Sequence, residues 1–202
     1  TSGADIHTAT AAQVFHVDPA DVTHEMRRRA KAVNFGIVYG ISAFSLSQDI
    51  GVTVAEAKAY MEAYFATFPG VRKYMDDVVA RAKEQGYVET LFHRRRELPE
   101  IKSSNFNMRS FGERVALNMP IQGTAADIMK LAMVAVEKRL KAELPEAKLV
   151  LQVHDELIVE CPAEQAETAA KLLEEEMEQV ARLSVPLTAE AHWGRNWLEA
   201  KG

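Results

Sequence analysis

Apolar residues recur with a helical period through the first two thirds of the chain. The clearest case is TVAEAKAYMEAYFATFPG, which begins at Thr53 and places alanine, tyrosine, methionine and phenylalanine on one face at intervals of three and four residues. Thr53 and Glu56 have the spacing of a capping box, and Pro69-Gly70 marks the end of the pattern. This stretch therefore predicts a helix with a buried aromatic face.

Comparable patterns predict further helices over about 4–17, 23–40, 42–51, 70–86, 108–141 and 162–183. Thr23 is a suitable cap for the second of these, and Gly40 a suitable stop. In the helix over 70–86 we expect Tyr74, Val78 and Ala82 to face inward. We expect Pro120 and Gly123 to interrupt and bend the helix over 108–141.

The last third has a different pattern. Leu149–Val153 and Leu157–Cys161 are β-rich runs joined by His154-Asp155-Glu156, which predicts a hairpin with a charged tip over about 148–161. A smaller hairpin is expected around Arg94–Arg96, from runs at 87–92 and 97–101, and Pro186–Trp193 predicts one more strand. The fold class is therefore α+β, with a helical part beside a layered part containing a hairpin, a helix and a further strand.

Composition, charge and missing motifs exclude several classes of function but do not identify one. The 202 residues carry a net charge of -5, which is unfavourable for a nucleic-acid binder. Arg27–Arg29 with Lys31, and Arg94–Arg96, nevertheless form local basic clusters that can attract a polyanion. The single cysteine, Cys161, cannot form an internal disulfide, and no apolar run is long enough to span a membrane. Dinucleotide, P-loop, serine-hydrolase and zinc-protease motifs are absent.

The stretch RRRAKAVNFGIVYG, from Arg27 to Gly40, is the first candidate site. Arg27, Lys31 and Phe35 follow at steps of four, so they form one ridge on a helix. Two cations followed by an aromatic ring suit the polyphosphate and base of a nucleotide. Gly36 in mid-helix suggests that something approaches closely there. A solvated basic turn followed by core-facing aromatic residues explains the same spacing.

Two further groups carry candidate chemistry. Adjacent carboxylates in His154-Asp155-Glu156 suit a divalent cation, although an ordinary polar turn is the alternative. Arg114, Asn118 and Gln122 form a row of hydrogen-bond donors that suits the minor groove of paired DNA, although a polar solvent-facing surface has the same spacing.

These groups, in this order, resemble the C-terminal part of family A, polymerase I-type DNA polymerases. Arg27-Arg28-x-x-Lys31-x-x-x-Phe35-Gly36-x-x-Tyr39-Gly40 is similar to that family's motif B, and Val153-His154-Asp155-Glu156 to its motif C. Asn118-x-Pro120-x-Gln122-Gly123 matches the family's helix along the duplex minor groove, and Trp193-Gly194-x-x-Trp197 resembles its C-terminus. The resemblance covers nearly the whole chain.

The resemblance implies a fingers subdomain over 1–104, with the motif B helix at about 23–40, and the C-terminal part of a palm over 105–202. It implies transfer of a nucleotide from dNTP to a primer 3′-hydroxyl, in replication and repair, with Mg²⁺ as cofactor and primer-template DNA as partner. The implied catalytic residues are Asp155, Glu156 and Lys31, with Asp155 as metal ligand. The implied dNTP-binding residues are Arg27, Lys31, Phe35 and Tyr39. The implied DNA-binding residues are Arg28, Arg114, Asn118, Gln122 and His154.

One family feature is not found in this sequence. Motif A, which carries the other essential aspartate, lies upstream of the segment that matches Asp5-Ile-His-Thr, and residues 1–4 do not contain it. We therefore expect the second carboxylate of the two-ion site to lie outside this chain. We also expect the chain alone to be inactive, and the thumb and motif A to come from the rest of a longer protein or from another chain. The resemblance implies a bacterial cytoplasmic setting at the nucleoid.

Three alternatives stay open. The first is a non-catalytic module that binds dNTP or DNA. The second is part of a single-subunit RNA polymerase, and the third is a helical interaction protein without a nucleotide site. RNA polymerases of that type carry Tyr at the position of Phe35 and His-Asp-Ser in place of His154-Asp155-Glu156, which favours the DNA polymerases.

Overall fold

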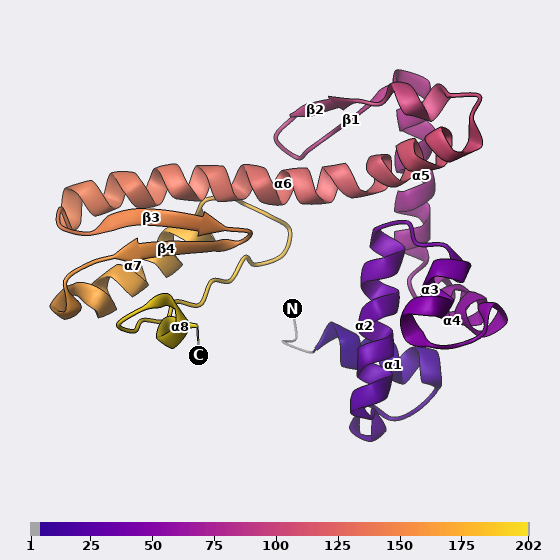
Figure 1. Cartoon of the computed structure of the whole chain (residues 1–202), viewed down its shortest axis with the longest axis horizontal. Helices are drawn as coiled ribbons and strands as arrows, with labels where there is room; N and C mark the ends of the chain where they lie inside the picture. Colours follow the sequence, from indigo (N-terminus) through magenta and orange to yellow (C-terminus); the bar gives the residue numbers. More distant parts are fainter. Residues whose placement is uncertain (1–4, 202) are drawn as a thin grey trace. The chain divides into compact units, whose positions relative to one another are not determined.

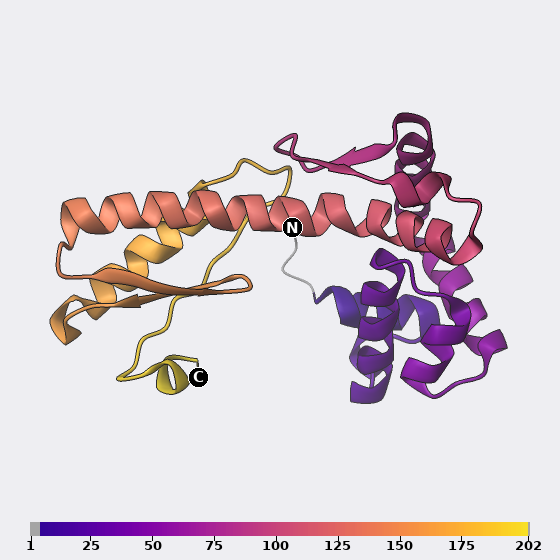
Figure 2. The same ribbon diagram turned by 45° about the horizontal axis from the view of Figure 1, so that its top comes forward.

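Helices dominate the computed structural model, which describes residues 5–201 (Figures 1 and 2). Among these residues there are two antiparallel sheets of two strands each. The α-helices are α1 (Ile6–Phe15), α2 (His24–Val38), α3 (Ala43–Ile50), α4 (Val54–Thr67), α5 (Pro69–Gln85), α6 (Phe106–Glu143), α7 (Ala166–Gln179) and α8 (Trp197–Ala200). The strands are β1 (Tyr87–Glu89), β2 (Arg95–Glu97), β3 (Lys148–Val153) and β4 (Glu156–Glu160). Short 3-10 helices are η1 (Pro19–Asp21), η2 (Pro99–Lys102) and η3 (Ala163–Gln165).

The described residues form two compact units, 5–122 and 123–201. The boundary lies within α6, which remains helical through Pro120 and Gly123, so the expected interruption is wrong. The proline removes one backbone hydrogen bond, but turns on both sides are packed, with Leu117 and Met129 buried. The division into fingers and palm at residue 104 concerns functional subdomains and stays a prediction.

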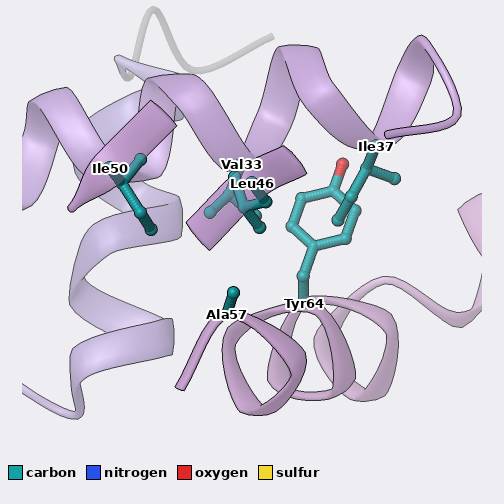
Figure 3. Close-up of a cluster of buried hydrophobic side chains, with 6 residues drawn as sticks. All are labelled: Val33, Ile37, Leu46, Ile50, Ala57 and Tyr64. Carbon is teal, nitrogen blue, oxygen red and sulfur yellow. The ribbon is translucent and has the colours of Figure 1, made fainter. Parts of the chain in front are cut away.

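The core of the first unit fixes the orientation of α2. Val33 and Ile37 of α2 pack against side chains of α3 and α4 in one buried cluster (Figure 3). The cluster comprises Val33, Ile37, Leu46, Ile50, Ala57 and Tyr64. The predicted capping box is present, because Thr53 accepts from the backbone of Glu56 and the Glu56 carboxylate accepts from the backbone of Thr53. The predicted aromatic face of α4 is therefore confirmed as core.

Helix α5 and the first hairpin share a second cluster, which includes Val78, Ala82, Val88 and Leu98. Tyr74, expected inside, is 39% exposed. Successive steps of four residues overshoot a helical turn of 3.6 residues, so Tyr74 lies roughly 80° around the helix from Ala82.

The strands of this hairpin are shorter than predicted, and β2 contains Arg95 and Arg96, which were expected in the loop. Pro99, which has no N–H to donate, begins a 3-10 helix instead of continuing the ladder. The Arg95 guanidinium is 2.6 Å from the Glu89 carboxylate and lies over the Tyr87 ring. The second basic cluster is therefore partly neutralised within the hairpin.

In the second unit, the β3–β4 hairpin shares a core with α6 and α7. Leu149 and Val159 of the strands pack with Val136, Leu140 and Leu172 of the helices. Figures 1 and 2 show the two strands side by side, and their antiparallel register pairs Val153 with Glu156. Glu156 therefore belongs to β4, and the loop contains only His154 and Asp155. The predicted three-residue tip is wrong in this detail.

The strand predicted over Pro186–Trp193 is not formed. The backbone N–H groups of Ala189 and Ala191 donate instead to the carboxylates of Glu178 and Glu174 on α7, at 3.1 and 2.9 Å. Because these N–H groups bond to side chains, the segment makes no ladder among the described residues. Helix α7 also ends at Gln179, earlier than predicted.

His93 offers a test of backbone strain in the first hairpin. Its φ of 62° lies in the left-handed region, where a Cβ atom is unfavourable, and its side chain is exposed. We expect His93→Gly to raise the free energy of unfolding by roughly 1 kcal/mol relative to His93→Ala, measured by urea denaturation. Both variants lose the imidazole, so only the backbone preference separates them. Equal stability of the two variants would show that the turn is not strained.

Candidate functional site

The predicted ridge on α2 is present, and its side chains lie on the face opposite the core. The Nζ atom of Lys31 is 5.9 Å from the centroid of the Phe35 ring. The Phe35 ring is nearly parallel to the Tyr39 ring, with centroids 6.4 Å apart. Phe35 and Tyr39 are 47% and 41% exposed, which is unusual for large aromatic side chains at the end of a packed helix. The alternative of core-facing aromatic residues is therefore wrong for this pair.

Two glycines shape the end of this helix. Gly40 has a φ of 69°, and a Cβ there would lie 3.1 Å from the side chain of Leu117. A Cβ at Gly36 would lie 2.8 Å from Cγ2 of Ile41, so the close approach expected at Gly36 comes from the chain itself. Beside these glycines lies a groove of about 670 Å³, lined in part by Phe35, Tyr39 and Arg114.

Arg27 is paired with a residue to which the sequence assigned no role. Its Nε atom donates to Oδ2 of Asp5 at 2.6 Å, and Nη2 lies 3.4 Å from Oδ1. Asp5 also caps α1, by accepting from the backbone N–H groups of His7 and Thr8. The Arg27 guanidinium, with the help of Thr8, holds the pKa of Asp5 well below its usual range. A ligand that binds Arg27 must therefore replace Asp5 or share the guanidinium with it.

Glu25 neutralises two more cations of the same cluster. Its carboxylate is 2.8 Å from Arg28 and 3.0 Å from Arg29. The hydrogen bonds from Arg28 and then Arg29 lower the pKa of Glu25 from 4.5 to about 2. Among residues 5–201, Lys31 has no such carboxylate partner. The cationic turn of the sequence is thus largely paired, and Lys31 is the cation available to a new anion.

His7 also belongs to this site, although the sequence analysis assigned no role to it. Its ring lies 5.7 Å from the Phe35 ring, and its Nδ1 atom is 3.0 Å from the amide nitrogen of Asn34. Asn34 is buried in α2 and also contacts Thr10 of α1. No local signal predicts these contacts, because His7 and Asn34 are 27 positions apart in the sequence.

The predicted donor row on α6 is only partly exposed. Arg114 donates to Ser110 at 3.0 Å, and the Gln122 amide donates to the Tyr39 hydroxyl at 3.3 Å. Asn118 is half-buried, and its Oδ1 atom is buried without a hydrogen-bond partner in the described part of the chain. The structure therefore links Gln122 to the end of the α2 ridge and leaves Arg114 and Gln122 exposed for a ligand.

The charged tip of the β3–β4 hairpin lies in the second unit. His154 has a φ of 52°, and its carbonyl accepts from the Gln152 side chain at 2.6 Å. Asp155 is exposed, whereas Glu156 is half-buried with its Oε1 atom 3.5 Å from Lys201 Nζ. No group of three His, Cys, Asp or Glu side chains suited to a metal is found within residues 5–201. Asp155 thus offers an exposed carboxylate at the two-residue turn between β3 and β4.

Comparison with known proteins decides the family. The sequence model of DNA polymerase family A matches residues 1–199. The chain belongs to DNA polymerase family A. This assignment decides against the single-subunit RNA polymerase and against an unrelated helical interaction protein. Within the described residues, no helix is long and apolar enough to cross a membrane.

Two similar proteins come from bacteria. The chain is 57% identical to DNA polymerase I of Geobacillus stearothermophilus over 199 residues, which are 98% of this chain and 23% of that protein. It is 55% identical to DNA polymerase I of Streptococcus pneumoniae over 200 residues, again 98% of this chain and 23% of that protein. The chain therefore spans about a quarter of the length of these relatives.

A solved structure has the same fold. The POL domain of Pol1 from M. smegmatis, in complex with DNA primer-template and dNTP, superposes with a TM-score of 0.95 at 43% identity. The match covers 100% of this chain and 36% of that one.

The Glu25 ion pairs predict a defined acid dependence. Because the pKa of Glu25 is lowered in the folded state, its stabilising effect is complete above about pH 4.5 and is lost as the pH falls to about 2. We expect wild type to melt above Glu25→Gln at neutral pH, with the difference disappearing toward pH 2. Carboxyl ¹³C NMR should give a titration midpoint near 2 for Glu25, and a higher one in a variant with Arg28→Gln and Arg29→Gln. A midpoint near 4.5 in the wild type would contradict the ion pairs.

Proposed function

We propose that this chain supplies the incoming-nucleotide site and one metal-binding carboxylate of a template-directed DNA polymerase. The observation that carries the proposal is the α2 ridge, where Lys31, which has no carboxylate partner within residues 5–201, lies beside the exposed rings of Phe35 and Tyr39. Family membership supports it, as does the M. smegmatis relative, which is described in complex with primer-template and dNTP.

The ridge suits a deoxynucleoside triphosphate from one end to the other. Lys31 and Arg27 would hold the triphosphate, since cations bind phosphate oxygens by charge-assisted hydrogen bonds. Phe35 would lie against the sugar and base, and Tyr39 beside the templating position. Arg27 would exchange the Asp5 carboxylate for phosphate oxygens, which keeps its guanidinium paired in both states. Lys31, as an ammonium near the phosphates, would also protonate the leaving pyrophosphate.

The remaining predicted residues suit the DNA. Arg114, Asn118 and Gln122 would donate hydrogen bonds to minor-groove acceptors, which are similar in all base pairs. The Gln122–Tyr39 hydrogen bond connects that row to the nucleotide ridge. We further propose that Arg28 contacts the pair at the primer end and that His154 contacts the primer terminus. Synthesis of this kind would serve replication and repair in the bacterial cytoplasm, at the nucleoid.

The tip of the β3–β4 hairpin fits part of a magnesium site. Mg²⁺ is commonly held by one or two carboxylates together with substrate phosphates, and Asp155 is one exposed carboxylate on a short turn. Glu156 would be a supporting carboxylate, because its Oε1 atom is already in contact with the Lys201 ammonium. When bound, the ion would neutralise charge on the reacting phosphates. We propose that the second carboxylate of a two-ion site lies outside this chain.

One alternative has an observation in its favour. Because residues 5–201 contain no cluster of three metal-binding side chains, a fragment that binds dNTP or DNA without catalysis is the second candidate. A polymerase and a non-catalytic fragment would both bind dNTP, but only the polymerase would extend a primer.

Binding of dNTP tests the ridge. Lys31→Ala should weaken binding of a dNTP to the 202-residue chain about ten- to hundredfold, because a hydrogen bond to a charged group contributes about 1.5–3 kcal/mol. Lys58→Ala is the matched control, since Lys58 is an exposed lysine on α4 with only a surface ion pair to Glu62. Isothermal titration calorimetry measures both. Equal affinities for the two variants would reject the ridge as the nucleotide site.

Primer extension separates the two candidate functions. We expect no extension by the chain alone, and extension when it is mixed with a polypeptide that carries the thumb and motif A of a relative. Asp155→Asn should abolish the product, whereas Glu167→Gln, which removes an exposed carboxylate from α7, should not. Extension by the chain alone would show that it contains a second metal-binding carboxylate. Binding of dNTP without extension in the mixture would favour the non-catalytic fragment.

A further inference from the structure

The β1–β2 hairpin carries the second basic cluster, Arg94–Arg96, to which the proposed function assigns no role. Arg95 and Arg96 are neighbours on β2 but have different surroundings. The Arg95 guanidinium is 2.6 Å from the Glu89 carboxylate and lies over the Tyr87 ring. Arg96 is exposed, and within residues 5–201 its guanidinium has no ion pair and no hydrogen bond. Arg96 is therefore available to an anion, whereas Arg95 is already paired.

The strand register places these two arginines on opposite faces of the hairpin. Arg96 is opposite Val88, and Arg95 is opposite Glu89. Residues directly opposite in an antiparallel pair point to the same face, and successive residues point to opposite faces. Val88 is 4% exposed and packs in the cluster that includes Ala116 of α6. The Arg96 side chain therefore leaves the strand on the face that covers α6, and Arg95 leaves it on the other face.

The hairpin borders the donor row of α6. Figures 1 and 2 both show it running alongside this helix. Val115 and Met119 of α6 pack against the cluster that the hairpin shares with α5. At 3.6 residues per turn, Asn118 and Gln122 lie roughly 60° around the helix from Val115 and Met119. The donor row is therefore the strip of α6 next to the strip that the hairpin covers.

A duplex whose minor groove lies on the donor row brings phosphates to the hairpin. The minor groove is only about 6 Å wide, and the two phosphate backbones border it on either side. A hairpin that flanks the donor row therefore faces one of these backbones. A guanidinium binds phosphate oxygens through charge-assisted hydrogen bonds, and backbone contacts of this kind position a protein on DNA without reading the sequence.

We propose that Arg96 binds a backbone phosphate of the duplex whose minor groove lies on Arg114, Asn118 and Gln122, and so holds the donor row over the groove. This inference rests on the proposed function, because that function places the duplex on α6. Arg95, which is held by Glu89 on the opposite face, takes no part. The contact is the same for every DNA sequence, since each nucleotide presents the same phosphate.

The salt dependence of DNA binding tests this contact. Each phosphate that a cationic side chain neutralises contributes about 0.9 to the slope of log K against log salt concentration. We expect Arg96→Gln to weaken binding of the full chain to a fluorescent primer-template and to reduce this slope by about 1, measured by fluorescence anisotropy between about 50 and 200 mM KCl. Arg95→Gln is the matched control, because it removes a neighbouring charge from the other face, and it should leave the slope unchanged. A wild-type slope in Arg96→Gln would overturn the proposal.

A conservative variant separates a phosphate contact from a structural role of Arg96. Arg96→Lys keeps the charge but not the planar guanidinium, so it should keep the slope while binding more weakly than the wild type. A reduced slope in Arg96→Lys as well would mean that the substitution disturbs the hairpin, and would overturn the proposal. The loss in Arg96→Gln should also be the same for primer-templates of different sequence, and a loss confined to one sequence would contradict a phosphate contact.

A variant of the donor row distinguishes failure of this proposal from failure of the proposed function. Gln122→Ala removes a donor without changing the charge, so it should weaken binding and leave the slope unchanged. If Gln122→Ala binds as the wild type does, the minor-groove role of Gln122 fails, while the slope of Arg96→Gln still decides whether the hairpin binds a phosphate. If the wild-type chain binds no primer-template, the DNA-binding part of the proposed function fails and the role of Arg96 fails with it.

Discussion

The placement of the nucleotide ridge in the first unit depends on the burial of one face of α2 against α3 and α4. Val33 and Ile37 are almost completely buried against α3 and α4, and this burial fixes the rotation of the helix about its axis. At 3.6 residues per turn, Lys31 and Phe35 are then forced to the other face. The left-handed residue Gly40 ends the helix against Leu117 and leaves Tyr39 beside the ridge. The hydrophobic effect thus places the groups that are proposed to bind the nucleotide, although none of those groups contributes to the core.

Charge pairing reconciles a basic cluster with an acidic protein. Asp5 and Glu25 hold three of the four cations at the start of α2, and Lys31 is the one of the four with no carboxylate partner in the part of the chain that the structure describes. These pairs are exposed, so each contributes little to stability. These ion pairs affect which anions can bind, because an anion must compete with a carboxylate at Arg27 and Arg28 but not at Lys31. A polyphosphate, with several charges in a row, meets that condition better than a single anion.

The second unit presents one exposed carboxylate at the tip of a well-packed hairpin. A hairpin of two strands is marginal on its own, but β3 and β4 are held by the apolar side chains of α6 and α7. Arg139 of α6 also lies 2.7 Å from Glu175 and 3.1 Å from Glu176 of α7. The supported hairpin ends in a two-residue turn with one exposed carboxylate, Asp155. That arrangement suits a group that works together with partners supplied from elsewhere.

Most helices and their ends could be read from the sequence, because their signals lie within four residues. The capping box at Thr53, the cap at Thr23 and the aromatic face of α4 are all where the pattern placed them. The same local signals failed at two places, once because of a distant partner and once because of the helical period itself. Residues 186–193 have a strand-like pattern but bond to side chains of α7, and Tyr74 continues an apolar pattern that the helical geometry turns toward solvent.

The candidate site divides in the same way. By itself the sequence determined the helix, its ridge of Arg27, Lys31 and Phe35, the hairpin with Asp155, and the resemblance to family A polymerases. Only the tertiary structure decided that Arg27 is paired with Asp5, 22 positions away, and that Asn34 holds His7 from 27 positions away. The physical reason is range: helix spacing and caps act between near neighbours, whereas hydrogen bonds and ion pairs between distant residues exist only after the core has brought α1 and α2 together.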